Sequence, residues 1–158
     1  MRSYPPAILD RKIRFALVGC GRIAKNHMNA IREHHDRAEL VGVCDVDPRA
    51  LDSAAGATGA RAWRSLDRML EACEADAFVL CTPSGLHPQQ AIQVARAGRH
   101  VITEKPMATR WEDGKAMVAA ADAAGVRLFV VKQNRRNATL QLLKSAVEKK
   151  RFGRIYIC

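Results

Sequence analysis

Two glycines one residue apart, Gly19 and Gly21, follow an apolar run directly, and a helix-forming pattern begins at once. Glycine permits a tight turn and lets the backbone approach a ligand closely, while the start of a helix offers unpaired N–H groups and a positive dipole end. Ala24 takes the third small position of a Gly-x-Gly-x-x-Gly/Ala pattern. This layout predicts a site for the pyrophosphate of a dinucleotide at Gly19, Gly21, Arg22 and Ile23.

An acidic residue stands where such a turn requires one. Asp45 ends the next strand pattern, 24 residues after Gly21. The dinucleotide fingerprint expects an acid about 20 residues on, which accepts a hydrogen bond from the 2′-hydroxyl of the adenosine ribose. The same carboxylate would repel a 2′-phosphate. We therefore predict that Asp45 binds the cofactor and that the cofactor is NAD rather than NADP.

Three more polar clusters each follow a strand-like apolar run, at residues 82–87, 104–106 and 132–137. Because ligands bind beyond the carboxyl ends of the strands of a parallel sheet, we expect these clusters to open on the same edge as the glycine turn. Lys105 is held before a proline at this edge. Its position favours a functional lysine over a solvated surface lysine.

The elements that must position these residues alternate regularly. Strand patterns at residues 13–18, 38–44, 61–63, 77–81, 100–103 and 126–131 are separated by helix patterns, and no hairpin signal joins them. Alternation of this kind predicts an α/β fold, a doubly wound parallel sheet of the Rossmann type with helices on both faces and strand order 3-2-1-4-5-6. His27 lies on the apolar stripe of the first helix, which favours a packed, hydrogen-bonded histidine over a catalytic one.

The chain divides into three parts. Residues 1–12 are expected to form a loose arm, and residues 13–151 the dinucleotide-binding domain. Residues 152–158 have the pattern of one more strand. We therefore expect a further domain to begin there.

Composition excludes several classes of protein. An apolar fraction of 48% and a charged fraction of 27% are typical of a globular protein. No apolar run approaches the roughly 20 residues that span a bilayer, and no signal peptide is visible, so we expect a cytoplasmic protein without membrane contact. Five scattered cysteines without metal-ligand spacing predict neither disulfides nor a metal site.

The net charge of +10 raises nucleic acid as a partner. The basic residues are spread thinly along the chain, however, and aromatic residues make up only 5% of it, too few for a platform on which bases stack. Binding of anionic small molecules explains part of this positive charge better than binding of nucleic acid does. We expect no nucleic-acid partner.

The glycine turn, residues 81–83 with His87, and the Glu-Lys-Pro sequence at 104–106 resemble the Gfo/Idh/MocA family of sugar oxidoreductases over nearly the whole chain. The resemblance implies that hydride passes between a sugar carbon and the nicotinamide, with Lys105 as the catalytic residue beside the substrate hydroxyl. It also implies cofactor contacts from five further residues. For Glu104 a surface acid, and for His87 a helix N-cap, remain alternatives. The five residues are Thr82, Pro83, Leu86, His87 and Glu104.

Residues 132–135 narrow the resemblance to dehydrogenases that oxidise C3 of UDP-N-acetyl-2-amino-2-deoxyglucuronate for lipopolysaccharide sugars. That likeness implies substrate contacts from Gln133, Asn134 and Arg135 besides Lys105. For Asn134 and Arg135 a solvated basic loop remains the alternative. A dehydrogenase of free sugars or inositol is the alternative within the family. A non-catalytic, dinucleotide-sensing regulator is the alternative of another class, and the intact sequence around Lys105 disfavours it.

Members of this family carry a second α/β domain, which supplies most of the sugar pocket and the oligomer interface. Because that domain carries the oligomer interface, the resemblance implies a homo-oligomer for the full-length enzyme. We expect that domain to lie outside this chain, since no sequence after Cys158 corresponds to it. For this chain alone we expect NAD(H) binding without turnover of the UDP-sugar, and exposed apolar surface where the second domain would pack.

Overall fold

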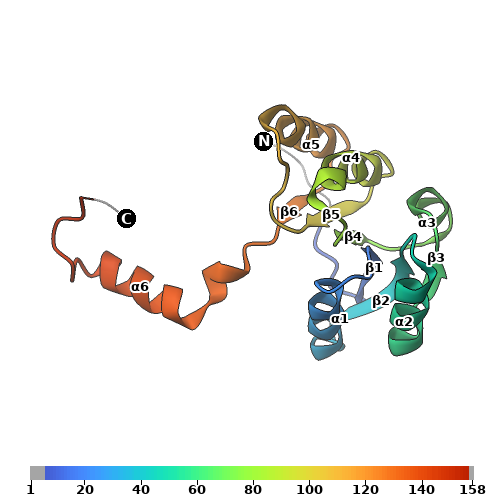
Figure 1. Cartoon of the computed structure of the whole chain (residues 1–158), viewed down its shortest axis with the longest axis horizontal. Helices are drawn as coiled ribbons and strands as arrows, with labels where there is room; N and C mark the ends of the chain where they lie inside the picture. The colour runs from blue at the N-terminus through green and yellow to red at the C-terminus, as the bar shows by residue number, and fades with distance from the viewer. Residues whose placement is uncertain (1–5, 157–158) are drawn as a thin grey trace.

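The computed structural model describes residues 6–156, in which six parallel strands form one sheet in the order β3-β2-β1-β4-β5-β6 (Figure 1). This is the strand order that the sequence predicts. The strands are β1 (Ile13–Val18), β2 (Ala38–Cys44), β3 (Arg61–Trp63), β4 (Ala77–Leu80), β5 (His100–Thr103) and β6 (Leu128–Val130).

A helix or a short helical turn follows each strand. Asp47 caps the second helix, since its carboxylate accepts a hydrogen bond of 2.9 Å from the Arg49 N–H, and Pro48 occupies the first helical position, where its missing N–H costs nothing. The α-helices are α1 (Ala24–Glu33), α2 (Pro48–Thr58), α3 (Leu66–Ala72), α4 (His87–Arg96), α5 (Trp111–Ala123) and α6 (Ala138–Glu148), and the 3-10 turns are η1 (Ser84–Leu86) and η2 (Gln133–Arg136).

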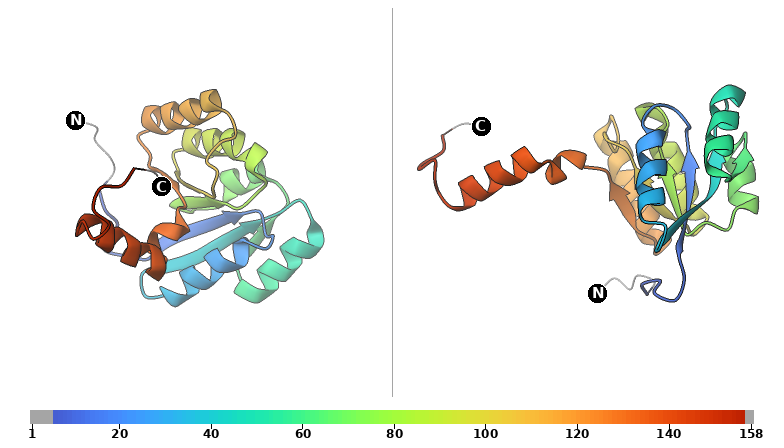
Figure 2. Two further views of the ribbon diagram at one scale, coloured as in Figure 1. Left: turned by 60° about the vertical axis from the view of Figure 1, so that its left-hand side comes forward. Right: turned by 90° about the horizontal axis from the view of Figure 1, so that it is seen from below.

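The sheet separates two apolar layers, because successive side chains of a strand point to opposite faces. Ala16 and Val18 of β1 belong to a cluster with buried residues of α3, α4 and α5, whereas Leu17 between them belongs to a cluster with residues of α1 and α2. Figures 1 and 2 show these two groups of helices on the two faces of the sheet. Helices on both faces confirm the predicted doubly wound arrangement.

The registers of the strands bring their carboxyl ends to one edge. Val18 of β1 pairs with Cys44 of β2 and with Leu80 of β4, Leu80 pairs with Thr103 of β5, and Thr103 pairs with Val130 of β6. The loops that follow these strands therefore open on the same edge, where ligands of doubly wound sheets bind.

The last part of the described chain differs from the body. No residue from 127 to 156 is buried, and α6 projects away from the sheet (Figures 1 and 2). The further strand expected from residue 152 does not form within residues 152–156, while residues 157 and 158 lie outside the described part. Within residues 6–156, no helix combines the length and the apolar character that a membrane span requires.

Candidate functional site

The turn between β1 and α1 has the geometry that its two glycines predict. Gly19 has a φ of 89°, and a Cβ there would lie 2.8 Å from the Cys81 carbonyl carbon and 2.8 Å from the Thr82 nitrogen. No other residue type fits this position without displacing backbone. Gly21 has no atom within 4 Å of the place a Cβ would take, so the space in front of its backbone is open. An anion can therefore approach the turn at Gly21, beside the start of α1.

Asp45, at the end of β2, fixes the glycine turn. Its Oδ2 accepts a hydrogen bond of 2.6 Å from the Cys20 N–H, and its Oδ1 accepts one of 2.9 Å from the Asp47 N–H. A carboxylate oxygen can accept more than one hydrogen bond, so the residue keeps acceptor capacity for a ribose hydroxyl. Sequence reasoning missed the bond to the turn, because it depends on β2 lying beside β1.

A hollow of about 570 Å³ opens at this edge of the sheet, and we call it the edge hollow. The structure brings eight of the ten predicted cofactor-binding residues together in its lining. They come from the ends of β1, β2 and β4 and from the turns that follow, as predicted for ligand-binding loops of such a sheet. These eight are Gly19, Gly21, Arg22, Ile23, Asp45, Thr82, Pro83 and Leu86.

Other residues of the edge hollow were not predicted. Val46 and Arg64 line it from the loops after β2 and β3, and Leu66 lines it from the start of α3. Gln90 lines it from α4, where its side-chain oxygen accepts a hydrogen bond of 2.5 Å from the Thr82 hydroxyl. Arg64 directly follows β3, so the rule that identified the other strand-end residues could also have identified this one. Gln90 lies inside a helix pattern and gave no such signal.

His87 does not line the edge hollow. It is 1% exposed, and its two ring nitrogens lie 2.9 Å from the Pro106 carbonyl oxygen and 2.8 Å from the Thr82 carbonyl oxygen. The alternative that it caps a helix is wrong, because α4 begins at His87 and Leu86 occupies the N-cap position. The side chain instead connects the loop after β4 to the loop after β5.

Glu104 is also absent from the lining. It is 7% exposed, so the alternative of a surface acid is wrong. Its Oε1 accepts a hydrogen bond of 2.7 Å from His27 Nε2, and its Oε2 accepts one of 3.3 Å from the Lys105 N–H. His27 is thus the packed, hydrogen-bonded histidine that the sequence favoured.

Lys105 follows β5 with an exposed side chain, and a cis peptide bond joins it to Pro106. The predicted substrate-binding residues occupy η2, after β6, and are exposed as well. Because β5 and β6 are neighbours that end together, the structure places both groups at the same edge of the sheet as the edge hollow. The η2 residues in question are Gln133, Asn134 and Arg135.

Three buried cysteines lie in the glycine turn or beside it, and they are poor nucleophiles. Burial raises the pKa of Cys20 and of Cys81 to about 12 and that of Cys44 to about 11. The thiolate is the reactive form of cysteine, and these thiols stay neutral near pH 7. They act as small apolar residues at the strand ends.

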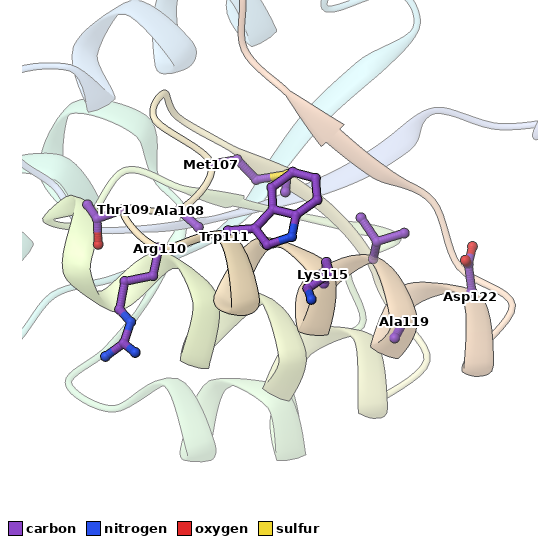
Figure 3. Close-up of a pocket in the computed structure, with 10 residues that line it drawn as sticks. Met107, Ala108, Thr109, Arg110, Trp111, Lys115, Ala119 and Asp122 are labelled. Atoms are coloured by element: carbon purple, nitrogen blue, oxygen red, sulfur yellow. The ribbon is translucent and has the colours of Figure 1, made fainter.

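A second hollow of about 600 Å³ lies between α5 and the loop after Pro106 (Figure 3). Met107 and Trp111 form much of its apolar wall, and the Lys115 ammonium lies 5.9 Å from the centre of the Trp111 ring. Its lining comes from one helix and one loop and includes no glycine turn or strand-end acid. The polar groups that could bind a dinucleotide are gathered at the edge hollow instead.

The chain matches the model of the GFO_IDH_MocA family, described as an oxidoreductase family with an NAD-binding Rossmann fold, over residues 13–132. It is also 33% identical over 143 residues to the inositol 2-dehydrogenase of Rhizobium meliloti, a match that covers 90% of this chain and 43% of that protein.

Two solved structures are more similar. The WlbA dehydrogenase of Bordetella pertussis, in complex with NADH and UDP-GlcNAcA, is 71% identical with a TM-score of 0.91 over 95% of this chain and 43% of that one. The WlbA dehydrogenase of Chromobacterium violaceum, with the same two ligands, is 66% identical with a TM-score of 0.93 over 99% of this chain and 45% of that one. The chain thus spans less than half the length of each of these relatives.

Proposed function

The chain belongs to the GFO_IDH_MocA oxidoreductase family, and from that membership we propose that it binds NAD and serves in the oxidation of a UDP-N-acetylglucosaminuronate at C3 of the sugar. One observation carries the proposal. The chain is 71% identical to a dehydrogenase whose crystal structure holds NADH and UDP-GlcNAcA, and the match covers 95% of the chain.

The residues of the edge hollow fit NAD. The open space at Gly21 admits a pyrophosphate next to the backbone N–H groups that begin α1. Asp45 has acceptor capacity left for the adenosine ribose, and its negative charge disfavours the 2′-phosphate of NADP. When bound, NAD supplies the acceptor for the hydride that leaves the sugar carbon.

Lys105 is the proposed catalytic residue. Oxidation of a secondary alcohol removes a hydride from carbon and a proton from oxygen, so the site needs a group that accepts the proton. The Lys105 side chain is exposed at the edge where the edge hollow opens, and in its amine form it can accept that proton. Its proposed task is to hold the substrate hydroxyl and take its proton.

The exposed residues of η2 are proposed to bind the substrate. A UDP-sugar acid carries a diphosphate and a carboxylate, which the Arg135 guanidinium can bind through paired hydrogen bonds. The amides of Gln133 and Asn134 can bind neutral parts of the sugar. The net charge of +10 supports an anionic substrate.

The biological setting is part of the same proposal. We infer synthesis of lipopolysaccharide sugars in the cytoplasm, with a homo-oligomeric enzyme and without nucleic acid or membrane as partners. The support for this setting is the resemblance of residues 132–135 to dehydrogenases of that pathway. A dehydrogenase of free inositol is the second candidate, supported by the relative at 33% identity.

Because turnover is proposed for an enzyme of the relatives' length, the test joins residues 1–151 of this chain to the remainder of the Bordetella pertussis relative. The joined enzyme is expected to reduce NAD with UDP-GlcNAcA and not with myo-inositol, as followed by absorbance at the NADH band. Its Lys105→Ala variant should bind NAD normally and lose turnover by roughly 10²- to 10⁴-fold, the usual contribution of an acid or base group.

Three results would contradict the proposal. Oxidation of inositol alone would support the second candidate. Binding of NAD without any oxidation would support a dinucleotide-sensing protein. Unchanged turnover in the Lys105→Ala variant would remove this residue from the mechanism.

A further inference from the structure

Two histidines from different helices hold the chain on either side of Lys105. His27, in α1, donates from Nε2 to Glu104 Oε1 over 2.7 Å, and His87, at the start of α4, donates from Nδ1 to the Pro106 carbonyl over 2.9 Å. Helices α1 and α4 cover opposite faces of the sheet (Figure 1). The residue before Lys105 and the residue after it are therefore fixed from the two faces.

The second nitrogen of His87 extends the connection to the edge hollow. Nε2 lies 2.8 Å from the Thr82 carbonyl oxygen, and Thr82 lines that hollow. A carbonyl oxygen can only accept, and a neutral imidazole has one N–H, so both contacts are hydrogen bonds only when both ring nitrogens carry hydrogen. At 1% exposure no solvent replaces a missing bond. The contact with the Pro106 carbonyl acts on the backbone beside Lys105, and it is a hydrogen bond when Nδ1 carries the hydrogen.

Glu104 requires its partner for a similar reason. A carboxylate that is 7% exposed has lost most of its water, and burial of an unpaired carboxylate is costly. His27 supplies the shorter of its two hydrogen bonds, and the Lys105 backbone N–H supplies the longer. The His27–Glu104 pair therefore acts on the backbone of Lys105 directly. The Lys105 side chain itself remains exposed.

We propose that His27 and His87 are positioning residues that together fix the backbone on either side of Lys105, His27 through Glu104 and His87 through the Pro106 carbonyl. The catalytic consequence rests on the proposed function, whereas the fixing of the backbone does not. A misplacement of about 1 Å at a reacting group can cost on the order of a hundredfold in rate. Neither histidine needs to touch substrate or cofactor to have such an effect.

Two substitutions of His87 separate its two bonds. In His87→Asn the side-chain amide nitrogen takes the place of Nδ1 and can still donate to the Pro106 carbonyl. In His87→Gln it takes the place of Nε2 and can donate only to the Thr82 carbonyl. His27→Phe removes the donor to Glu104 and keeps a ring of similar size. His100→Phe is the matched control, because His100 begins the strand that Glu104 follows and lies at its opposite end.

Backbone hydrogen exchange of this chain measures how often the backbone beside Lys105 opens. The Glu104 N–H donates to the Leu80 carbonyl over 3.1 Å, and the Lys105 N–H donates to Glu104 Oε2 over 3.3 Å. For these two amides, exchange in His87→Gln and His27→Phe is expected to be at least about tenfold faster than in the unsubstituted chain, since local openings expose backbone hydrogen bonds. His87→Asn and His100→Phe should stay within about threefold. Nitrogen NMR of the His87 ring should show hydrogen on Nδ1. A ring without hydrogen on Nδ1, or equal exchange in all variants, overturns the proposal.

Turnover of the joined enzyme gives the second readout. His87→Gln and His27→Phe should lower kcat by roughly 10- to 100-fold while NAD affinity changes less than about threefold, and His87→Asn should recover most of kcat. Equal losses in His87→Asn and His87→Gln, or losses that only follow the folded fraction, would show a merely structural role. If the joined enzyme has no activity, the proposed function fails, and exchange and NMR still decide on the two histidines.

Discussion

The body of the molecule, residues 13–131, and the segment formed by η2 and α6 differ in the burial of their apolar side chains. Leu17 and Leu80 in the body are fully buried, whereas Leu140, Leu143 and Val147, spaced to share one face of α6, are 41%, 49% and 43% exposed. Apolar spacing therefore predicts where a helix forms without predicting what it packs against. The edge hollow, where we propose that NAD binds, is built by the body alone, while the proposed substrate residues lie on the segment that has no buried residue.

The same substitution in the two regions tests this contrast most strongly. Leu80→Ala removes a side chain that is 0% exposed and should lower the free energy of unfolding by about 2–5 kcal/mol. Leu142→Ala removes one that is 72% exposed and should change it by less than about 0.5 kcal/mol. Denaturant titration followed by circular dichroism measures both. Equal losses would mean that α6 is packed in solution.

Within the body, substitutions of the two glycines of the turn should differ in their effects on stability and on NAD binding. Gly19→Ala places a Cβ 2.8 Å from two backbone atoms of the loop after β4, so we expect a loss of about 1–3 kcal/mol in stability together with loss of NAD binding. Gly21→Ala meets no atom within 4 Å, so the fold should keep its stability while NAD affinity falls. A stable Gly19→Ala chain that binds NAD normally would refute the close approach at this turn.

Asp45 should affect the cofactor preference more than the fold. Asp45→Ser removes the acceptor of the Cys20 N–H and the negative charge near the adenosine ribose, so we expect NAD affinity to fall about tenfold, the equivalent of one hydrogen bond, and the preference for NAD over NADP to shrink. Asp47→Ser, which keeps a capping oxygen for α2, is the control. An unchanged ratio of the two dissociation constants would contradict the ribose assignment.

The smallest expected effect concerns the edge of the body opposite the edge hollow. Arg11 donates hydrogen bonds of 2.7 and 2.8 Å to Asp76, and the pKa of Asp76 is lowered chiefly by this pairing. A lowered carboxyl pKa contributes stability above its unfolded value of about 4, and that contribution is lost as the pH falls through the folded value.

Acid unfolding followed by circular dichroism checks this contribution. Asp76→Asn should be slightly less stable than the unsubstituted chain at pH 7 and should lose less stability below pH ~4, because the carboxyl no longer titrates. Glu74→Gln, at a side chain that is 82% exposed, should behave like the unsubstituted chain. Identical acid profiles for all three proteins would show that the Arg11–Asp76 pair does not contribute to the free energy of unfolding of the body.

Most of the body could be predicted from the sequence, because its signals are local. The apolar runs, the glycine turn and the polar residues after each strand specify the sheet and eight residues of the edge hollow. The roles of Asp45 and His87 could not be predicted in full, since their hydrogen bonds join loops that are distant in the sequence. The same holds for the burial of Glu104, which depends on α1.

The central claim is that the body binds NAD at the glycine turn without help from other parts of the protein. Isothermal titration of NAD into this chain and into its Gly21→Ala variant tests it most directly. The account predicts saturable binding of one NAD per chain, weakened in the variant while the free energy of unfolding stays the same. Absence of binding to the folded chain, or equal affinity in the variant, would contradict the account.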